Sequence, residues 1–265
     1  MSYTIAITGK GGVGKTTVAG LVALRLIASG RRPVLAVDAD PNTCLDSALG
    51  VRAEATVGGV REEAKVLAGE NNTTGVAKQE LLRIKIAQSL VETDDFDLIA
   101  MGRPEGPGCY CFANHALRAT LKEIADDYPY VVIDNEAGLE NLSRRIVREL
   151  DLMIIVADPS RQGLETVRRL FGLAREMATK VKQLVLVINR LRREALPQTV
   201  ASLQAETGAS LAIALPEDDE LNRLSEAGGR LAALPRSNRV VAGIDRLLFE
   251  AGVPTLSREK QGYQT

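Results

Sequence analysis

Residues 9–16 read GKGGVGKT, a run that could bind the phosphates of a nucleotide. The run satisfies the pattern G-x-x-x-x-G-K-[ST] and lies between a strand-like and a helix-like stretch, which is the context that this motif requires. Its glycines let backbone N–H groups approach phosphate oxygens, and the start of the following helix adds partial positive charge. Lys15 is suited to the β and γ oxygens and the Thr16 hydroxyl to Mg²⁺; a glycine-rich turn without a ligand is the alternative. The residues predicted to bind nucleotide here are Gly11, Gly12, Val13, Gly14, Lys15, Thr16 and Thr17.

Carboxylates end two further strand-like runs. Asp38 and Asp40 stand in VDADP, and Asp134 stands in VVIDNEAG. Each could be only a turn or helix cap, but beside a phosphate loop they lie where a metal-bound triphosphate would be. We expect Asp38 and Asp134 to serve Mg²⁺, with Asp134 acting through the ligands of the ion. Asp40 is expected to position or activate the attacking water.

The stretch EGPGCYCFANHALR, residues 105–118, concentrates soft metal ligands. It holds Cys109 and Cys111, two of the three cysteines, and His115, the only histidine. The residues before Cys109 disfavour regular structure and those after Cys111 have a helical pattern, so the pair is expected at a loop-to-helix junction. Thiolates suit Zn²⁺, Cu⁺, Ni²⁺ or an iron–sulfur cluster, and a helix N-terminus favours the thiolate.

Two thiolates do not complete a four-coordinate site, which leaves three interpretations open. His115, four residues after Cys111, would share a helix face with it and give a three-ligand set in one chain. Two-fold symmetry would instead bring two C-x-C pairs together across a homodimer interface. The cysteines could also be small hydrophobic residues that bind nothing, and packing is the role expected of the remaining one, Cys44.

The elements that must position these residues are seven short apolar runs, each followed by a helical segment. This alternation predicts an α/β fold with a single, doubly wound, mostly parallel sheet covered by helices on both faces, as in P-loop NTPases. We expect one domain over residues 1–265, with a polar helical and loop insertion at 52–96 and a disordered tail at 257–265. The runs are 3–8, 33–38, 97–102, 130–134, 152–158, 183–189 and 210–215.

Composition narrows the classes of function. The 265 residues are 45% hydrophobic and carry a formal net charge of −1, so nothing draws the chain to nucleic acid or to an anionic membrane. The apolar runs are too short to span a bilayer, and the N-terminal run has no signal-peptide pattern. Three cysteines, an odd number, cannot form a disulfide framework, which favours the reducing cytoplasm.

Lys10 stands directly after the first glycine of the loop, and this extra lysine makes the loop resemble that of a known family of ATPases. K-G-G-x-G-K-[ST] is the loop of the deviant-Walker ATPases, which include MinD, ParA, Mrp and the nitrogenase iron protein, and DADP and DNEAG follow in the order of that family. The resemblance implies ATP hydrolysis and a nucleotide-dependent homodimer in which Lys10, a catalytic residue with Lys15 and Asp40, reaches the partner's phosphates. It also implies adenine contacts from Asn189 and from the loop at Pro216 and Glu217. The guanine-reading N-K-x-D pattern is absent.

Within that class, GPGCYCFANHALR and DNEAGLEN resemble CooC, the nickel-maturation ATPase of carbon monoxide dehydrogenase, and its relatives that serve acetyl-CoA synthase. The resemblance implies Ni²⁺ or Zn²⁺ held by Cys109 and Cys111 between two subunits, and delivery to a client nickel enzyme, which makes His115 a bystander. Two rivals stay open: a redox ATPase with a dimer-bridging [4Fe-4S] cluster, and a MinD- or ParA-like regulatory ATPase without metal. The basic amphipathic membrane helix that ends MinD has no counterpart in the polar tail here.

Overall fold

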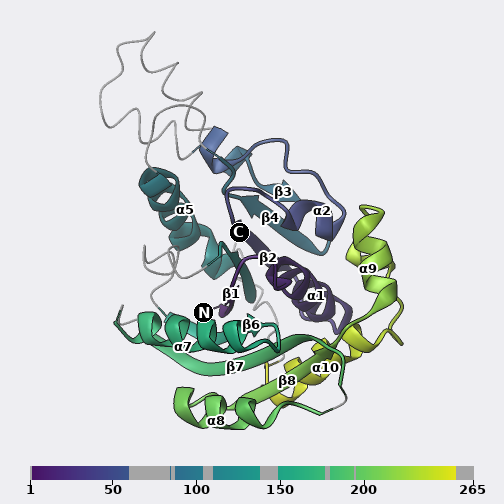
Figure 1. Cartoon of the computed structure of the whole chain (residues 1–265). Coiled ribbons are helices and arrows are strands. Elements are labelled where there is room, and N and C mark those ends of the chain that lie inside the picture. Colours follow the sequence, from purple (N-terminus) through teal and green to yellow (C-terminus); the bar gives the residue numbers. More distant parts are fainter. Residues whose placement is uncertain are drawn as a thin grey trace.

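One mixed sheet organises the chain. The structure, a computed structural model, describes residues 2–59, 84, 87–103, 110–137, 149–176, 180–193 and 195–254, with the backbone alone for 110–116. Its eight described strands are all parallel except the edge strand β3 (Figure 1). In spatial order they are β3 (Val91–Glu92), β4 (Phe96–Ala100), β2 (Val34–Ala39), β5 (Tyr130–Asn135), β1 (Tyr3–Gly9), β6 (Glu149–Ala157), β7 (Lys180–Leu191) and β8 (Leu211–Pro216).

The central strands are buried on both faces, which explains their nearly continuous apolar sequences. All six residues of β2 and all six of β5 are buried. The described helices are α1 (Lys15–Ala28), α2 (Leu45–Leu49), α5 (Tyr110–Ile124), α7 (Arg161–Glu176), α8 (Gln198–Thr207), α9 (Asp219–Glu226) and α10 (Arg239–Glu250), with two 3₁₀ turns at Ala125–Asp127 and Leu231–Ala233.

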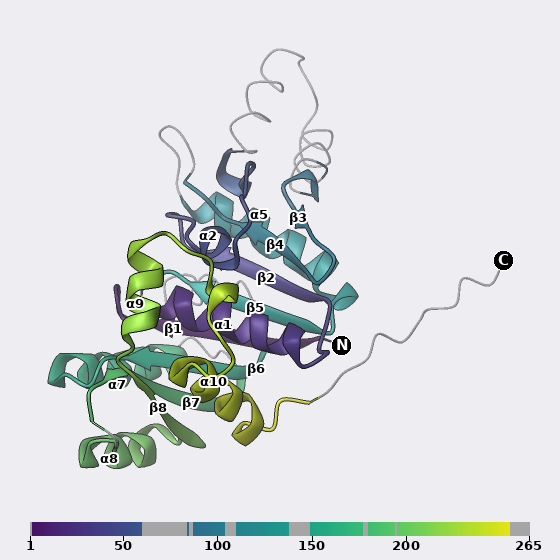
Figure 2. The ribbon, with the colours of Figure 1, turned by 90° about the vertical axis from the view of Figure 1, so that its right-hand side faces the viewer.

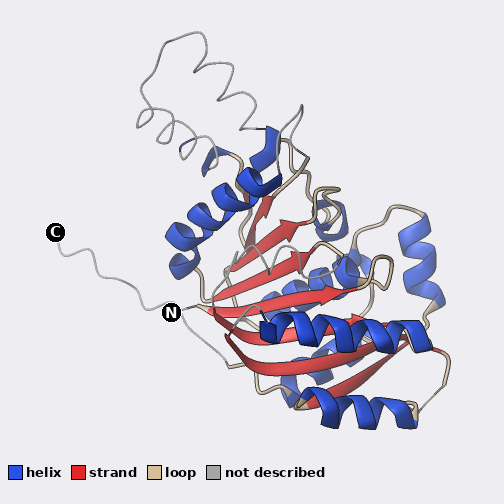
Figure 3. Cartoon of the chain, turned by 60° about the vertical axis from the view of Figure 1, so that its left-hand side comes forward, coloured by secondary structure: helices blue, strands red, loops and turns tan. Residues whose placement is uncertain are grey.

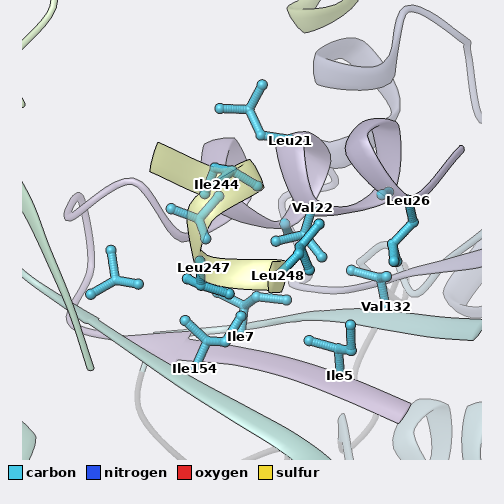
Figure 4. Packing of buried hydrophobic residues seen from close by; sticks show 14 of the residues in the cluster. Ile5, Ile7, Leu21, Val22, Leu26, Val132, Ile154, Ile244, Leu247 and Leu248 are labelled. Atoms are coloured by element: carbon cyan, nitrogen blue, oxygen red, sulfur yellow. The ribbon is translucent and has the colours of Figure 1, made fainter. Parts of the chain in front are cut away.

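Two apolar clusters hold the helices on opposite faces. Buried residues of α5, α7 and α8 pack on one face (Figure 3), and those of α1, α2 and α10 pack on the other (Figure 2). Figure 4 shows part of the second cluster, in which side chains of α1 and α10 lie over the sheet. The labelled residues are Leu21, Val22, Leu26, Ile244, Leu247 and Leu248 from the helices, with Ile5, Ile7, Val132 and Ile154 from the strands.

The path of the chain places the carboxyl end of β1 at a topological switch point. From β1 the chain passes to β2 and β4 on one side, returns to β5, and then crosses β1 to β6, β7 and β8. Ligands of open α/β sheets bind in the crevice beyond the carboxyl ends of the strands at such a point. The predicted doubly wound parallel sheet is therefore confirmed, and its switch point coincides with the predicted phosphate loop.

Two details differ from the expectations, and others fall outside the described residues. β3 pairs antiparallel with β4 inside the segment 52–96 that we expected to be helical and loop-like. Cys44, expected to pack, is exposed, because it lies in the loop after β2 rather than on the buried face of α2. Most of the predicted insertion and the whole of 257–265 lie outside the described residues. Within the described part, no helix is both long and apolar enough to cross a membrane.

Candidate nucleotide-binding site

The loop between β1 and α1 has the geometry of a phosphate cradle. Gly14 precedes α1 with φ 94°, and no side chain caps the helix there, so the first N–H groups of α1 face the carboxyl end of the sheet. Gly9 packs so tightly on β6 that a Cβ atom would lie 2.2 Å from the carbonyl oxygen of Val156. The loop therefore approaches its neighbours as only glycine permits.

Gly9→Ala is expected to destabilise the fold by more than about 3 kcal/mol, because the new methyl group would overlap a backbone carbonyl that cannot move without breaking the sheet. Urea denaturation measures the effect. Gly172→Ala is the matched control, since a Cβ on that helical glycine of α7 meets nothing within 4 Å and should be neutral or slightly stabilising. Equal denaturation midpoints for the two variants would contradict the packing at Gly9.

Asn189 holds the loop from the side of β7. Its Nδ2 donates to the carbonyl oxygen of Val13 at 2.8 Å, and the side chain is buried. A Cβ on Gly14 would lie 2.6 Å from the same Nδ2. The structure thus brings Asn189 to the phosphate loop as a brace, while its predicted contact with adenine stays a prediction.

Lys15 lies buried at the start of α1, with 7% of its surface exposed. Its Nζ donates to the carbonyl oxygen of Lys10 at 3.2 Å. Burial lowers the pKa of Lys15, while the carboxylates of Asp134, Asp40 and Glu136 raise it. The ammonium group therefore lies among the acidic side chains of the site. From there it can donate charge-assisted hydrogen bonds to the phosphate oxygens of a bound nucleotide.

Asp38 and Asp134 form a buried acidic pair on neighbouring strands, as predicted. They are register partners on β2 and β5, with 0% and 1% of their surfaces exposed. Burial raises the pKa of Asp134 to about 7; a hydrogen bond with the Thr16 side chain and the charge of Lys15 lower it, and Asp38 raises it further. Burial likewise raises the pKa of Asp38 to about 6. Two buried carboxylates side by side favour protonation of at least one of them.

One oxygen of this pair is poised for a ligand. Asp134 Oδ1 is buried and has no hydrogen-bond partner within the described part of the chain. The same part contains no group of three or more His, Cys, Asp or Glu side chains that could hold a metal alone. Hydroxyl and carboxylate oxygens are nevertheless the ligands that Mg²⁺ takes alongside phosphates and waters. Thr16 and Asp134 therefore fit a Mg²⁺ ion that arrives with a nucleotide.

Asp134→Asn is expected to raise the free energy of unfolding of the nucleotide-free protein at pH 8 by about 1–3 kcal/mol, because it removes a buried charge. The pKa of Asp134 in the folded protein lies above its ordinary value of 3.8, so as pH rises Asp134 loses its proton in the unfolded chain before it does in the folded one. The free energy of unfolding of the wild type should therefore fall as pH rises from 3.8 to about 7. Thermal unfolding between pH 5 and 8 checks both effects, and the exposed Asp126→Asn is the control. A variant with an unchanged pH slope would contradict this assignment.

The loop after β2 is organised by two aspartates. Asp38 accepts from the backbone N–H groups of Asp40 at 3.0 Å and of Cys44 and Leu45 at 2.8 Å. Asp40 Oδ1 in turn accepts from the backbone and the side-chain nitrogen of Asn42. Asp38 thus positions the loop, and its predicted contact with Mg²⁺ stays a prediction. Asp40 lies half-buried at the edge of the site, within electrostatic reach of Lys15.

Lys10 is exposed at the tip of the phosphate loop. Burial raises the pKa of Asp158, but hydrogen bonds from Ser160 and the charge of Lys10 bring it below its ordinary value. Asp158 follows β6, the neighbour of β1, so the two residues meet across the switch point. An exposed lysine at this place can reach outward from the chain, as the family resemblance requires of Lys10.

The far side of the site lies at the ends of β7 and β8. Leu191 and Pro216 are register partners there, and Glu217 donates its backbone N–H to Leu191 at 3.2 Å. The carboxylate of Glu217 pairs with Arg192 at 2.5 Å. Pro216 and Glu217 therefore lie beside the strand that carries Asn189, while their predicted adenine contacts stay predictions.

The predicted soft-metal site falls largely outside the described residues. Cys109 lies in the segment 104–109, and only the backbone of Cys111 and His115 is described. That backbone belongs to α5, which begins at Tyr110, so Cys111 stands in its first turn. The expected loop-to-helix junction is confirmed on its helical side only.

Several polar residues at this edge were missed by sequence reasoning. Asn42 donates to Asp40, Arg103 donates to Asn42, and Asp158 interacts with the charge of Lys10. Asn135 donates to the carbonyl oxygen of Ile7 at 2.9 Å, just before the phosphate loop. Asp158 and Asn135 could have been found, because each stands at the carboxyl end of a strand beside β1. Nothing in the sequence marks Arg103.

Comparisons with known proteins agree with this geometry. The family model described as AAA domain matches residues 2–187. The uncharacterized ATP-binding protein MJ0685 of Methanocaldococcus jannaschii is 41% identical over 244 residues, covering 92% of this chain and 96% of that protein. The carbon monoxide dehydrogenase accessory protein CooC of Rhodospirillum rubrum is 36% identical over 188 residues, covering 66% and 70%. MinD of Bacillus subtilis, a septum site-determining protein, is 27% identical, covering 98% and 94%.

Solved structures share the fold. The cell division ATPase MinD of Pyrococcus furiosus superimposes with a TM-score of 0.68 at 22% identity, covering 94% of this chain and 98% of that one. MinD of Pyrococcus horikoshii, solved with Mg-ADP, gives a TM-score of 0.66 at 22% identity, covering 93% and 94%. Binding of nucleotide with Mg²⁺ is typical of this fold. On the match to the AAA domain model, to MJ0685 and to CooC, the chain belongs to this family of P-loop ATPases, and its fold is that of MinD.

Proposed function

We propose that the chain is an ATP-dependent metallochaperone that binds Ni²⁺ or Zn²⁺ through Cys109 and Cys111 at a homodimer interface. ATP hydrolysis then releases nickel to a client enzyme, carbon monoxide dehydrogenase or acetyl-CoA synthase. The observation that carries this proposal is the 36% identity to CooC, in a chain whose sequence holds a C-x-C pair and whose α5 includes Cys111 in its first turn. Two thiolates per chain suffice for a four-coordinate site if two copies meet there.

The nucleotide site supplies the energy for release. The uncapped start of α1 and Lys15 would hold the phosphates, and Thr16 with Asp134 would hold Mg²⁺, which neutralises developing charge on the transferred phosphoryl group. Asp40 would orient the attacking water from the loop after β2. Asn189 keeps the carbonyl of Val13 in place, which fixes the loop around the phosphates.

Lys10 and the cysteines make the dimer the working unit. An exposed Lys10 would reach the nucleotide of the partner, and the same association would bring the two C-x-C pairs together. The metal must then bind the ATP-bound dimer more tightly than it binds the protein after hydrolysis. A ligand with equal affinity for both states would not change the equilibrium between them. By reciprocity, metal should favour that dimer.

A transfer assay tests the proposal. Nickel-loaded protein is mixed with nickel-free carbon monoxide dehydrogenase, and CO oxidation is followed with ATP or with a non-hydrolysable ATP analogue. Activity should appear with ATP and stay at background with the analogue or with Cys109→Ala/Cys111→Ala. Equal activation by the double variant would count against metal delivery through the cysteine pair.

A regulatory ATPase without metal is the second candidate. The match to MinD of Bacillus subtilis extends over 98% of this chain, further than the match to CooC. In that case ATP with Mg²⁺ would control association, and removal of Ni²⁺ and Zn²⁺ by a chelator, with Mg²⁺ restored, would change neither hydrolysis nor oligomeric state. Hydrolysis and oligomeric state are measured in EDTA-treated and in untreated buffer, with the same concentration of free Mg²⁺ in both. This comparison separates the two candidates.

A further inference from the structure

Asp40 is connected to a distant part of the chain through one asparagine side chain. Asp40 Oδ1 accepts from the backbone nitrogen of Asn42 at 2.8 Å and from its Nδ2 at 2.9 Å. The other end of the same amide, Oδ1 of Asn42, accepts a hydrogen bond from the guanidinium group of Arg103. Both bonds go to one carboxylate oxygen, Oδ1, so they restrain the rotation of the carboxylate and leave Oδ2 without a bond from Asn42.

Arg103 projects from a backbone that is itself anchored. It stands three residues beyond the last residue of β4, beside the end of β2. The backbone nitrogen of Met101 donates to the carbonyl oxygen of Asp38 at 2.8 Å, and its carbonyl accepts from Gly58 at the same distance. The guanidinium group therefore reaches the β2 loop from a fixed base, and it turns the amide of Asn42 so that Nδ2 faces Asp40.

We propose that Asn42 and Arg103 are positioning residues, which hold the carboxylate of Asp40 in place for ATP hydrolysis. The inference rests on the proposed function for the role of Asp40. Asn42 and Arg103 are both exposed, and exposed polar pairs contribute little to stability. Their substitution should therefore change catalysis while the unfolding transition stays in place.

Steady-state ATPase kinetics test the positioning role. Asn42→Ala and Arg103→Ala should each lower kcat about 5- to 20-fold and leave the KM for ATP within about 2-fold. Because the two act through one chain of bonds, the double variant should be no slower than Asn42→Ala. Asn42→Asp keeps an acceptor for Arg103 but faces Asp40 with a carboxylate, so it should be as slow as Asn42→Ala. Arg103→Lys should restore part of the rate.

Arg246→Ala is the matched control, because this exposed arginine pairs with Glu250 on α10 and should keep the wild-type rate. A wild-type kcat in Arg103→Ala, or a double variant whose loss is the product of the two single losses, overturns the positioning role. A shifted urea midpoint with an unchanged kcat would assign the two residues a purely structural part.

Discussion

Lys15→Ala is expected to lower the rate of ATP hydrolysis by at least about 100-fold, because it removes the cation that faces the transferred phosphate in a buried site. Lys15 has 7% of its surface exposed and lies near Asp134 and Asp40, whereas Lys10, the other lysine of the loop, is exposed at its tip. In the variant, Mg²⁺ alone would offset the charge of the phosphoryl group beside the acidic pair. A coupled phosphate-release assay at saturating ATP measures the loss.

The control for this variant is Lys182→Ala, which removes an exposed lysine that pairs with Asp151 at 2.7 Å. That variant should hydrolyse ATP at the wild-type rate. Circular dichroism must show both variants folded, and this is expected because burial lowers the pKa of Lys15 and its charged form gains little from the folded state. Hydrolysis retained by a folded Lys15→Ala protein would show that the phosphate site is elsewhere.

Cys109→Ala/Cys111→Ala is expected to abolish tight binding of Ni²⁺ and Zn²⁺, since thiolates are the soft ligands in the predicted site. In the presence of ATP, wild-type protein should bind one metal ion per two chains, as a site shared across a two-fold axis requires. Equilibrium dialysis followed by metal analysis gives both the affinity and the stoichiometry.

Cys44→Ala separates a specific effect from a general loss of thiols. Cys44 is exposed, but its partial burial and the nearby carboxylates of Asp38, Asp40 and Asp134 raise the pKa of its thiol, which therefore stays neutral at pH 7. This variant should bind metal as the wild type does. One ion per single chain in the wild type would instead favour a site completed by His115, and metal binding unchanged in the double variant would exclude the cysteine pair.

The sequence predicted the frame of the site because the frame depends on local patterns. Continuous apolar runs gave the strands within one or two residues at most ends, and a phosphate-loop motif between strand and helix placed the nucleotide site. Asp38 and Asp134 were expected on neighbouring strands, and they are register partners. A parallel sheet gathers the carboxyl ends of its strands at one edge, so strand-terminal carboxylates could be grouped from sequence alone.

Contacts between segments that are distant in the sequence could not be predicted in this way, because they depend on how the segments pack. Arg103 and Asn42 are 61 residues apart, and nothing in either sequence context marks a hydrogen bond between them. Asn189 was expected at the nucleotide, but its bond to the carbonyl of Val13 depends on how β7 lies against the phosphate loop. Packing was the default role expected of Cys44, at the start of a helical pattern, whereas its backbone bond to Asp38 holds it in an exposed loop.

Gel filtration with nucleotide and metal varied independently tests the central claim most directly. Wild-type protein is run with ATP or ADP, each with and without Ni²⁺ or Zn²⁺, beside Cys109→Ala/Cys111→Ala and Cys44→Ala. A dimer that forms fully only with ATP and metal together, and that the double cysteine variant fails to form, is the predicted result. A metal-dependent dimer of equal strength in the double variant, or a dimer indifferent to metal in the wild type, would contradict the shared metal site.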